Sequence, residues 1–181
     1  PGAVQWMTAG SGIIHHEMPR PVNGRMGGFQ LWVNLPASSK MITPRYQEVP
    51  AEEIPTVTPR NDVSIRVICG TVNGITGPVR NIIASPRFLD ISLAPDTFFT
   101  LPVPDGHTAI AYITGGEGTF DAGEGHRVQN RDLVLFSRGS SIWTRSFGKG
   151  MRFLLISGKP TGEPVAWRGP IVMNTREELR Q

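Results

Sequence analysis

Glycine and proline interrupt the chain at short intervals along its whole length. The 181 residues include 21 glycines and 16 prolines, and the apolar runs between them are short. Because glycine and proline favour turns and are poorly tolerated inside long helices, this pattern is typical of many short strands joined by tight turns. The sequence therefore predicts an all-β fold.

The part of the chain after residue 63 holds a regular series of strand candidates. They cover residues 64–69, 87–93, 97–101, 109–114, 118–121, 132–136, 141–146 and 151–157. Strands in this number and spacing are typical of a jelly-roll barrel, also called a double-stranded β-helix. In segment 87–93, apolar and polar residues alternate, so we expect one face of that strand to be buried and the other to face water.

The part before residue 60 holds too few strand candidates to close a barrel. They cover residues 4–8, 13–18 and 29–35, and a proline-rich segment from Lys40 to Pro59 then predicts an extended link. We therefore expect two domains. Residues 1–58 would be the carboxyl-terminal portion of a first barrel plus a linker, and residues 59–181 a complete second barrel.

We expect both ends of the chain to be truncated. The chain begins on an apolar segment without an initiator methionine. Near the other end, Asn174 and Thr175 can cap a helix whose first turn carries Glu177 and Glu178, which suits the helix dipole. We expect that helix to run for about two turns, to the last residue.

Charge and cysteine content exclude several functional classes. The net charge is +3, but the lysines and arginines are scattered singly, which argues against direct nucleic-acid binding. No apolar stretch reaches the roughly 18 to 20 residues of a membrane span, so no membrane association is expected. The one cysteine, Cys69, lies in an apolar run where a buried, inert thiol is the usual outcome, and a reducing cytoplasm fits best.

The best metal-ligand cluster in the sequence is His15-His16-Glu17, which follows two isoleucines. If this segment is a strand, side chains alternate, so His15 and Glu17 share one face and point into the barrel. An imidazole and a carboxylate suit a divalent transition metal, and iron, manganese, nickel and zinc are all admissible. The spacing is equally compatible with His15 as a hydrogen-bonded core histidine and Glu17 as its partner.

Longer motifs carry a resemblance to a known family. Residues 4–19 (VQWMTAGSGIIHHEMP), 30–36 (QLWVNLP), 46–48 (YQE) and 169–175 (GPIVMNT) resemble the blocks of the pirin family, in the same order. Within the first block, Gly12 and His15 also resemble the second half of the cupin motif. The resemblance covers essentially the whole chain.

The resemblance implies two cupin barrels in tandem, with one Fe(II) in the amino-terminal barrel held by three histidines and a glutamate. His15 and Glu17 are the positions that match this pattern. The other two histidines belong to an H-x-H segment expected upstream of residue 1. An isolated chain of this sequence is therefore expected to hold half of the metal site and to be inactive alone.

The second barrel is expected to lack a metal. The position of the second-motif histidine falls on Ile142, which has no ligand atom. His107 and His126 lie in turn-like surroundings, where we expect histidines that are solvated or that only support a metal ligand. A structural or regulatory role for this barrel agrees with the family.

The resemblance implies two functions. The first is a cupin oxidoreductase of the quercetin 2,3-dioxygenase type, in which the metal orients a flavonol-like small molecule and oxygen, while Glu17 serves as ligand and proton acceptor. The alternative is a metal-dependent regulatory protein that binds transcription or metabolic partners without catalysis. A degenerate, metal-free cupin is the third interpretation.

Overall fold

The computed structural model describes residues 2–16, 18, 21, 23–24, 26–123 and 125–180. Contacts divide the chain into two compact units. The first unit comprises Pro1–Ala51 and Thr161–Gln181, and the second comprises Glu52–Pro160. The two domains predicted from the sequence, residues 1–58 and 59–181, remain a proposal. None of the helices in the described part of the chain has the length and apolar character needed to cross a bilayer.

The second unit is built almost entirely of strands, and the all-β jelly-roll prediction is confirmed. Its main sheet has the order β10-β9-β12-β7-β4-β3, with β11 also paired to β9 and β8 to β12. The strands of this sheet are β3 (Thr56–Arg60), β4 (Val63–Cys69), β7 (Arg87–Leu93), β8 (Phe98–Pro102), β9 (Thr108–Thr119), β10 (Arg127–Gln129), β11 (Leu133–Leu135) and β12 (Ser141–Gly158). A separate hairpin joins β5 (Thr71–Val72) to β6 (Ile75–Thr76).

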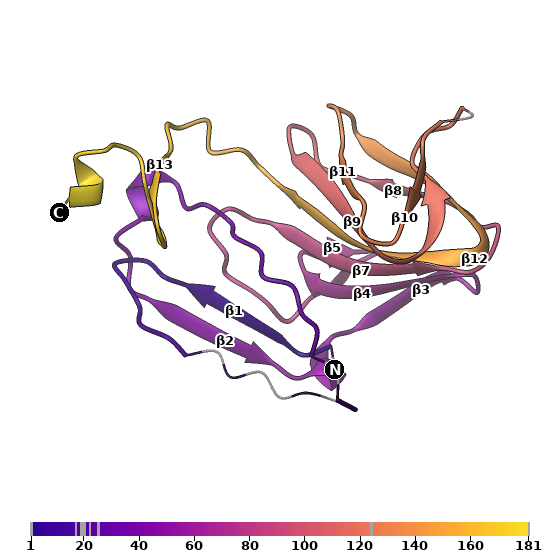
Figure 1. The fold of residues 1–181 in the computed structure, drawn as a ribbon, viewed down its shortest axis with the longest axis horizontal. Coiled ribbons are helices and arrows are strands. Elements are labelled where there is room, and N and C mark those ends of the chain that lie inside the picture. Colours follow the sequence, from indigo (N-terminus) through magenta and orange to yellow (C-terminus); the bar gives the residue numbers. More distant parts are fainter. Residues whose placement is uncertain are drawn as a thin grey trace. The chain divides into compact units, whose positions relative to one another are not determined.

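In the second unit, β8, β10 and β11 lie in one layer and β3, β4 and β7 in the other, and the long strands β9 and β12 take part in both layers (Figure 1). The first part of β12 pairs with β8, whereas its second part pairs with β7 and β9. The pairing of β12 with β9 shifts register between Ser146 and Met151. At this bend Gly116 has φ of +69°, and a Cβ there would clash with the carbonyl oxygen of Gly150. Only glycine allows these two backbones to approach so closely.

The core of the second unit lies between these layers. Its fully buried side chains include Ile65, Leu89, Ile91, Phe153 and Leu155. They alternate along β4, β7 and β12, as expected for strands with one face toward the core.

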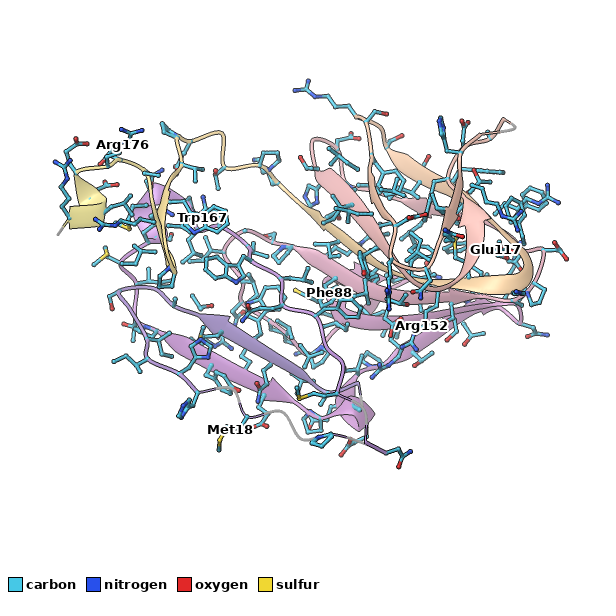
Figure 2. The ribbon with its side chains drawn as sticks, in the orientation of Figure 1. Met18, Phe88, Glu117, Arg152, Trp167 and Arg176 are labelled. Atoms are coloured by element: carbon cyan, nitrogen blue, oxygen red, sulfur yellow. The ribbon has the colours of Figure 1, made fainter. Side chains whose placement is uncertain are left out.

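The other face of β7 is less exposed than its alternation predicts. Asp90 on that face is only 6% exposed, which corrects the expectation of a wet face. Arg152 of β12 donates two hydrogen bonds to its carboxylate, at 2.9 and 2.6 Å, and Arg66 of β4 lies 3.6 Å away. Arg152 is labelled in Figure 2. The two flanking arginines cover Asp90, which the sequence of one strand alone cannot indicate.

In the described part of the first unit there are two small strand pairs. The antiparallel pairs are β1 (Val4–Thr8) with β2 (Arg45–Val49), and β13 (Ala166–Arg168) with β14 (Ile171–Met173). Single 3-10 turns occur at η1 (Ala37–Ser39), η2 (Ala51–Glu53) and η3 (Glu178–Arg180), of which η2 crosses the boundary between the units.

The segment from Lys40 to Pro59 is not the extended link that its prolines predict. It supplies β2, which pairs with β1, and β3, which pairs with β4. Pro59 lies within β3, where the register shifts between Val57 and Arg60. Because β3 is the edge strand of its sheet, a residue without an amide hydrogen is tolerated there.

Two other local predictions are corrected. Residues 29–35 are described but form no strand, although their apolar pattern favours one. The terminal helix is a single 3-10 turn, not two α-helical turns. Its capping residues are nevertheless as expected, since Thr175 Oγ1 accepts a hydrogen bond from Glu178 N, and Glu178 Oε2 accepts from the backbone of Asn174 and Thr175.

Candidate metal centre

A tight turn precedes His15. After β1 ends at Thr8, Gly12 N donates to Ala9 O at 3.0 Å and Ser11 N donates to Ile42 O at 2.9 Å. Gly10 in this turn has φ of +52°. The turn is therefore held to the segment that leads into β2.

The strand predicted over residues 13–18 is not formed in the described part of that segment, residues 13–16 and 18. His15 and His16 are exposed, as is the whole side chain of Ile14. None of the described strands pairs with residues 13–16, so these residues have no hydrogen-bond ladder. A strand requires such a ladder, which explains the difference.

Glu17, the other predicted ligand and the proposed catalytic residue, lies outside the described residues. Within the described residues, no three or more His, Cys, Asp or Glu side chains come together as a metal site would require. The donors of this segment fit Fe(II) in kind, being one imidazole and one carboxylate, but not in number.

The interior of the second barrel is apolar where the family motif places a ligand. Ile142 is 5% exposed and belongs to the core cluster, together with Val103. Phe120 packs edge-on against both Phe136 and Phe153, with ring centroids 5.2 and 5.1 Å apart. These side chains carry no atom that binds a metal ion.

The two histidines of the second unit differ in environment. His126 is exposed, whereas His107 is half-buried in the turn before β9. Burial lowers the pKa of His107, and the nearby charges of Arg87 and Lys159 lower it further. A neutral imidazole is therefore favoured at His107 near neutral pH.

A buried lysine in the first unit is a polar feature that the sequence did not predict. Lys40 is 6% exposed, and its Nζ donates to Asn34 Oδ1 at 2.8 Å and to Val172 O at 3.1 Å. Burial lowers the pKa of Lys40, while the charges of Glu163 and Glu178 oppose that shift. Asn34 lies only six positions from Lys40, but Val172 lies 132 positions away, so no local pattern could reveal the contact with Val172.

Comparison with known protein families shows to which family the chain belongs. The family model "Pirin C-terminal cupin domain" matches residues 88–181, and the model "Pirin" matches residues 1–33. The chain belongs to the pirin family. A relative from Thermoplasma acidophilum, named provisionally as a quercetin 2,3-dioxygenase, is 39% identical over 100% of this chain and 75% of its own length.

Other pirins are similar over almost the whole chain. Pirin-1 of Arabidopsis thaliana is 43% identical over 98% of this chain and 62% of its own, and the Pirin of Homo sapiens is 39% identical over 100% and 62%. A crystal structure named quercetin 2,3-dioxygenase from Acinetobacter baumannii superposes with a TM-score of 0.86 at 33% identity, over 99% of this chain and 63% of that one. The chain thus spans less than two thirds of the length of several pirins that it matches.

Proposed function

We propose that the whole protein is a metal-dependent dioxygenase of the quercetin 2,3-dioxygenase type, acting on a flavonol-like molecule. The observation that carries this proposal is the similarity, at 33% identity and a TM-score of 0.86, to a solved structure of that name. A similarly named relative at 39% identity supports it.

In this proposal His15 and Glu17 supply two of the metal ligands. The chemistry that bound Fe(II) provides is Lewis acidity and a template that orients the reactants. Glu17 also accepts the proton of the substrate hydroxyl, a step that a carboxylate within hydrogen-bond reach can perform. The other ligands are proposed to come from an H-x-H segment upstream of residue 1, since the described residues hold no group of three or more His, Cys, Asp or Glu side chains that could bind a metal.

The test compares His15→Ala with His16→Ala in the whole protein. The two histidines are adjacent and both exposed, so the substitutions remove the same group from the same segment. We expect His15→Ala and Glu17→Ala to lose bound iron and quercetin-dependent oxygen uptake, and His16→Ala to retain both. Elemental analysis and an oxygen electrode supply the two readouts. Equal losses in His15→Ala and His16→Ala would contradict the ligand assignment.

A second candidate function is metal-dependent binding of a regulatory or metabolic protein. Large apolar side chains exposed in the first unit favour it, among them Trp32, Met41 and Trp167. Iron-loaded protein that captures a partner but takes up no oxygen with quercetin would support this function over the enzymatic one.

A further inference from the structure

A cavity of about 430 Å³ opens at one end of the second barrel. Its lining residues are Gly106, His107, Thr108, Arg138, Gly139 and Pro160. This set includes a cation, an imidazole, a hydroxyl and two glycines, and no acidic residue. All of these lining residues belong to the second unit, whereas His15 belongs to the first.

The sheet brings these residues together from three parts of the sequence. Thr108 begins β9 and pairs with Gly158 at the end of β12, which places the turn before β9 beside the segment after β12. Val103 N donates to Ser140 O at 2.8 Å, which ties the segment after β8 to the loop that carries Arg138 and Gly139. The cavity is therefore framed by paired strands and not by one loop.

The charge around the cavity is positive. Arg138 lines it, and the charges of Arg87 and Lys159 reach His107, whose pKa they lower. Arg87 donates to the carbonyl oxygens of Pro102 at 2.5 Å and Thr71 at 3.1 Å, which hold its guanidinium without neutralising it. Asp105 lies in the same turn as His107 but does not line the cavity.

One polar atom of the His107 side chain also lacks a hydrogen-bond partner among the described residues. Its backbone N–H donates to Pro104 O at 3.1 Å, which fixes the turn, but its buried Nδ1 has no hydrogen-bond partner in the described part of the chain. A buried polar atom without a partner is uncommon and costs stability. Destabilising features of this kind are common at functional sites, where the side chain interacts with a ligand.

We propose that this cavity binds a phosphate group, either inorganic phosphate or the phosphate of a small monoester. Arg138 binds the phosphate oxygens by charge-assisted hydrogen bonds, and the hydroxyl of Thr108 supplies a neutral donor. His107 becomes protonated as the anion arrives, because a nearby negative charge favours the charged imidazole. The volume falls in the range of small-molecule sites, about 300 to 1,000 Å³, and leaves room for a group attached to the phosphate.

The test is a titration of the intact, metal-free chain with inorganic phosphate and, separately, with glycerol 3-phosphate, followed by calorimetry and by proton NMR of the His107 ring. We expect saturable binding that weakens with added salt, and a pKa of His107 that rises when phosphate is bound. Arg138→Gln should weaken binding about tenfold or more, which corresponds to one charge-assisted hydrogen bond. Arg138→Lys should retain part of the affinity.

Arg131→Gln is the matched control, because Arg131 is an exposed arginine at the other end of β11 and its loss changes the net charge equally. Tighter binding of glycerol 3-phosphate would identify a monoester as the ligand, and equal binding would identify free phosphate. Absence of saturable binding, or equal losses in Arg138→Gln and Arg131→Gln, would overturn the proposal. Neither result bears on the dioxygenase function, since no metal is present.

Discussion

Gly10 occupies a position where the backbone of Ile42 leaves no room for a side chain. Its φ is +52°, and a Cβ there would overlap the carbonyl oxygen of Ile42. That oxygen already accepts a hydrogen bond from Ser11 N, so it is held in place. The turn leading from β1 to His15 therefore depends on glycine both for its conformation and for its contact.

We expect Gly10→Ala to lower the free energy of unfolding by about 2 to 4 kcal/mol, since left-handed strain and overpacking add. Gly24→Ala is the control, because Gly24 also has positive φ (+70°) but no atom of the described residues lies within 4 Å of the added Cβ. Gly24→Ala should lower the free energy of unfolding by about 1 kcal/mol. Urea denaturation measures both, and equal losses would show that the contact with Ile42 is unimportant.

Cys69 is a buried free thiol whose Sγ lies 3.3 Å from Pro86 O. Burial raises the pKa of this thiol from its usual 9.0 to about 11, so the thiol is the inert group that the apolar sequence around it predicts. In the folded chain the proton is retained at a pH where the unfolded chain has already lost it.

This difference predicts a specific loss of stability in alkali. Because the pKa of Cys69 is raised on folding, its contribution is complete below pH 9 and is lost as the pH rises toward about 11. Between pH 9 and 11 we expect the free energy of unfolding of the unsubstituted protein to fall by about 1 to 2 kcal/mol more than that of Cys69→Val, which has no thiol. Denaturant titrations of both proteins between pH 8 and 11 give the difference, and parallel pH profiles would contradict it.

At the scale of elements, the sheet of the second unit is joined on its outer face by a carboxylate and two arginines. Asp90 on β7 receives Arg152 from β12 and Arg66 from β4, so one ion cluster spans three neighbouring strands. Asp90 is almost fully buried, whereas 55% of the Arg152 side chain is exposed. Removal of the arginine therefore leaves a desolvated carboxylate, while removal of the aspartate leaves an arginine that water can solvate.

We expect Arg152→Met to destabilise the chain by about 2 to 3 kcal/mol, because Asp90 then keeps only the longer contact with Arg66. The double variant Arg152→Met with Asp90→Asn should recover part of that loss, since a neutral amide is less costly to bury. A double-mutant cycle in urea checks this coupling. Strict additivity of the two substitutions would exclude it.

Sequence patterns located most of the strands in the second unit but not every strand in the first part of the chain. Segment 87–93 coincides with β7, because alternating apolar residues meet a buried face there. The strands β2 and β3 were obscured by prolines, which in this fold stand at an edge or beside the strands. Residues 29–35 show the converse error, since an apolar pattern forms no strand unless a partner supplies the ladder.

At the scale of the whole molecule, the contact units cut the chain at different places from the predicted domains. The contact boundary at Ala51/Glu52 keeps β3 with β4, whereas a start at residue 59 divides β3 (Thr56–Arg60). β3 also covers one edge of the main sheet, and Pro55 O accepts a hydrogen bond from Val67 N. The segment before residue 59 therefore contributes directly to the second barrel.

We expect a fragment of residues 52–160 to fold with cooperative unfolding, because it contains the complete core cluster. A fragment of residues 59–160 should be less stable and more prone to aggregate, since most of β3 is lost and β4 becomes an edge. Circular dichroism in urea and light scattering compare the two. Equal stability would favour a domain boundary at residue 59.

The all-β class, the barrel type and the pirin relationship could be predicted without coordinates. Turn residues and alternation are local signals, and family motifs such as residues 4–19 are contiguous. The capping of η3 was likewise predictable, because it depends on a few neighbouring residues, and the burial of Cys69 was indicated by the apolar run in which it lies.

The burial of Asp90, the Lys40 contacts and the cavity at His107 could not be predicted in this way. Each joins residues far apart in sequence, such as Asp90 with Arg152 or His107 with Arg138. Pairing between strands decides which distant side chains meet, and no single segment records that pairing. Which side chains come together in such a site is therefore decided by the tertiary structure and not by any single segment of the sequence.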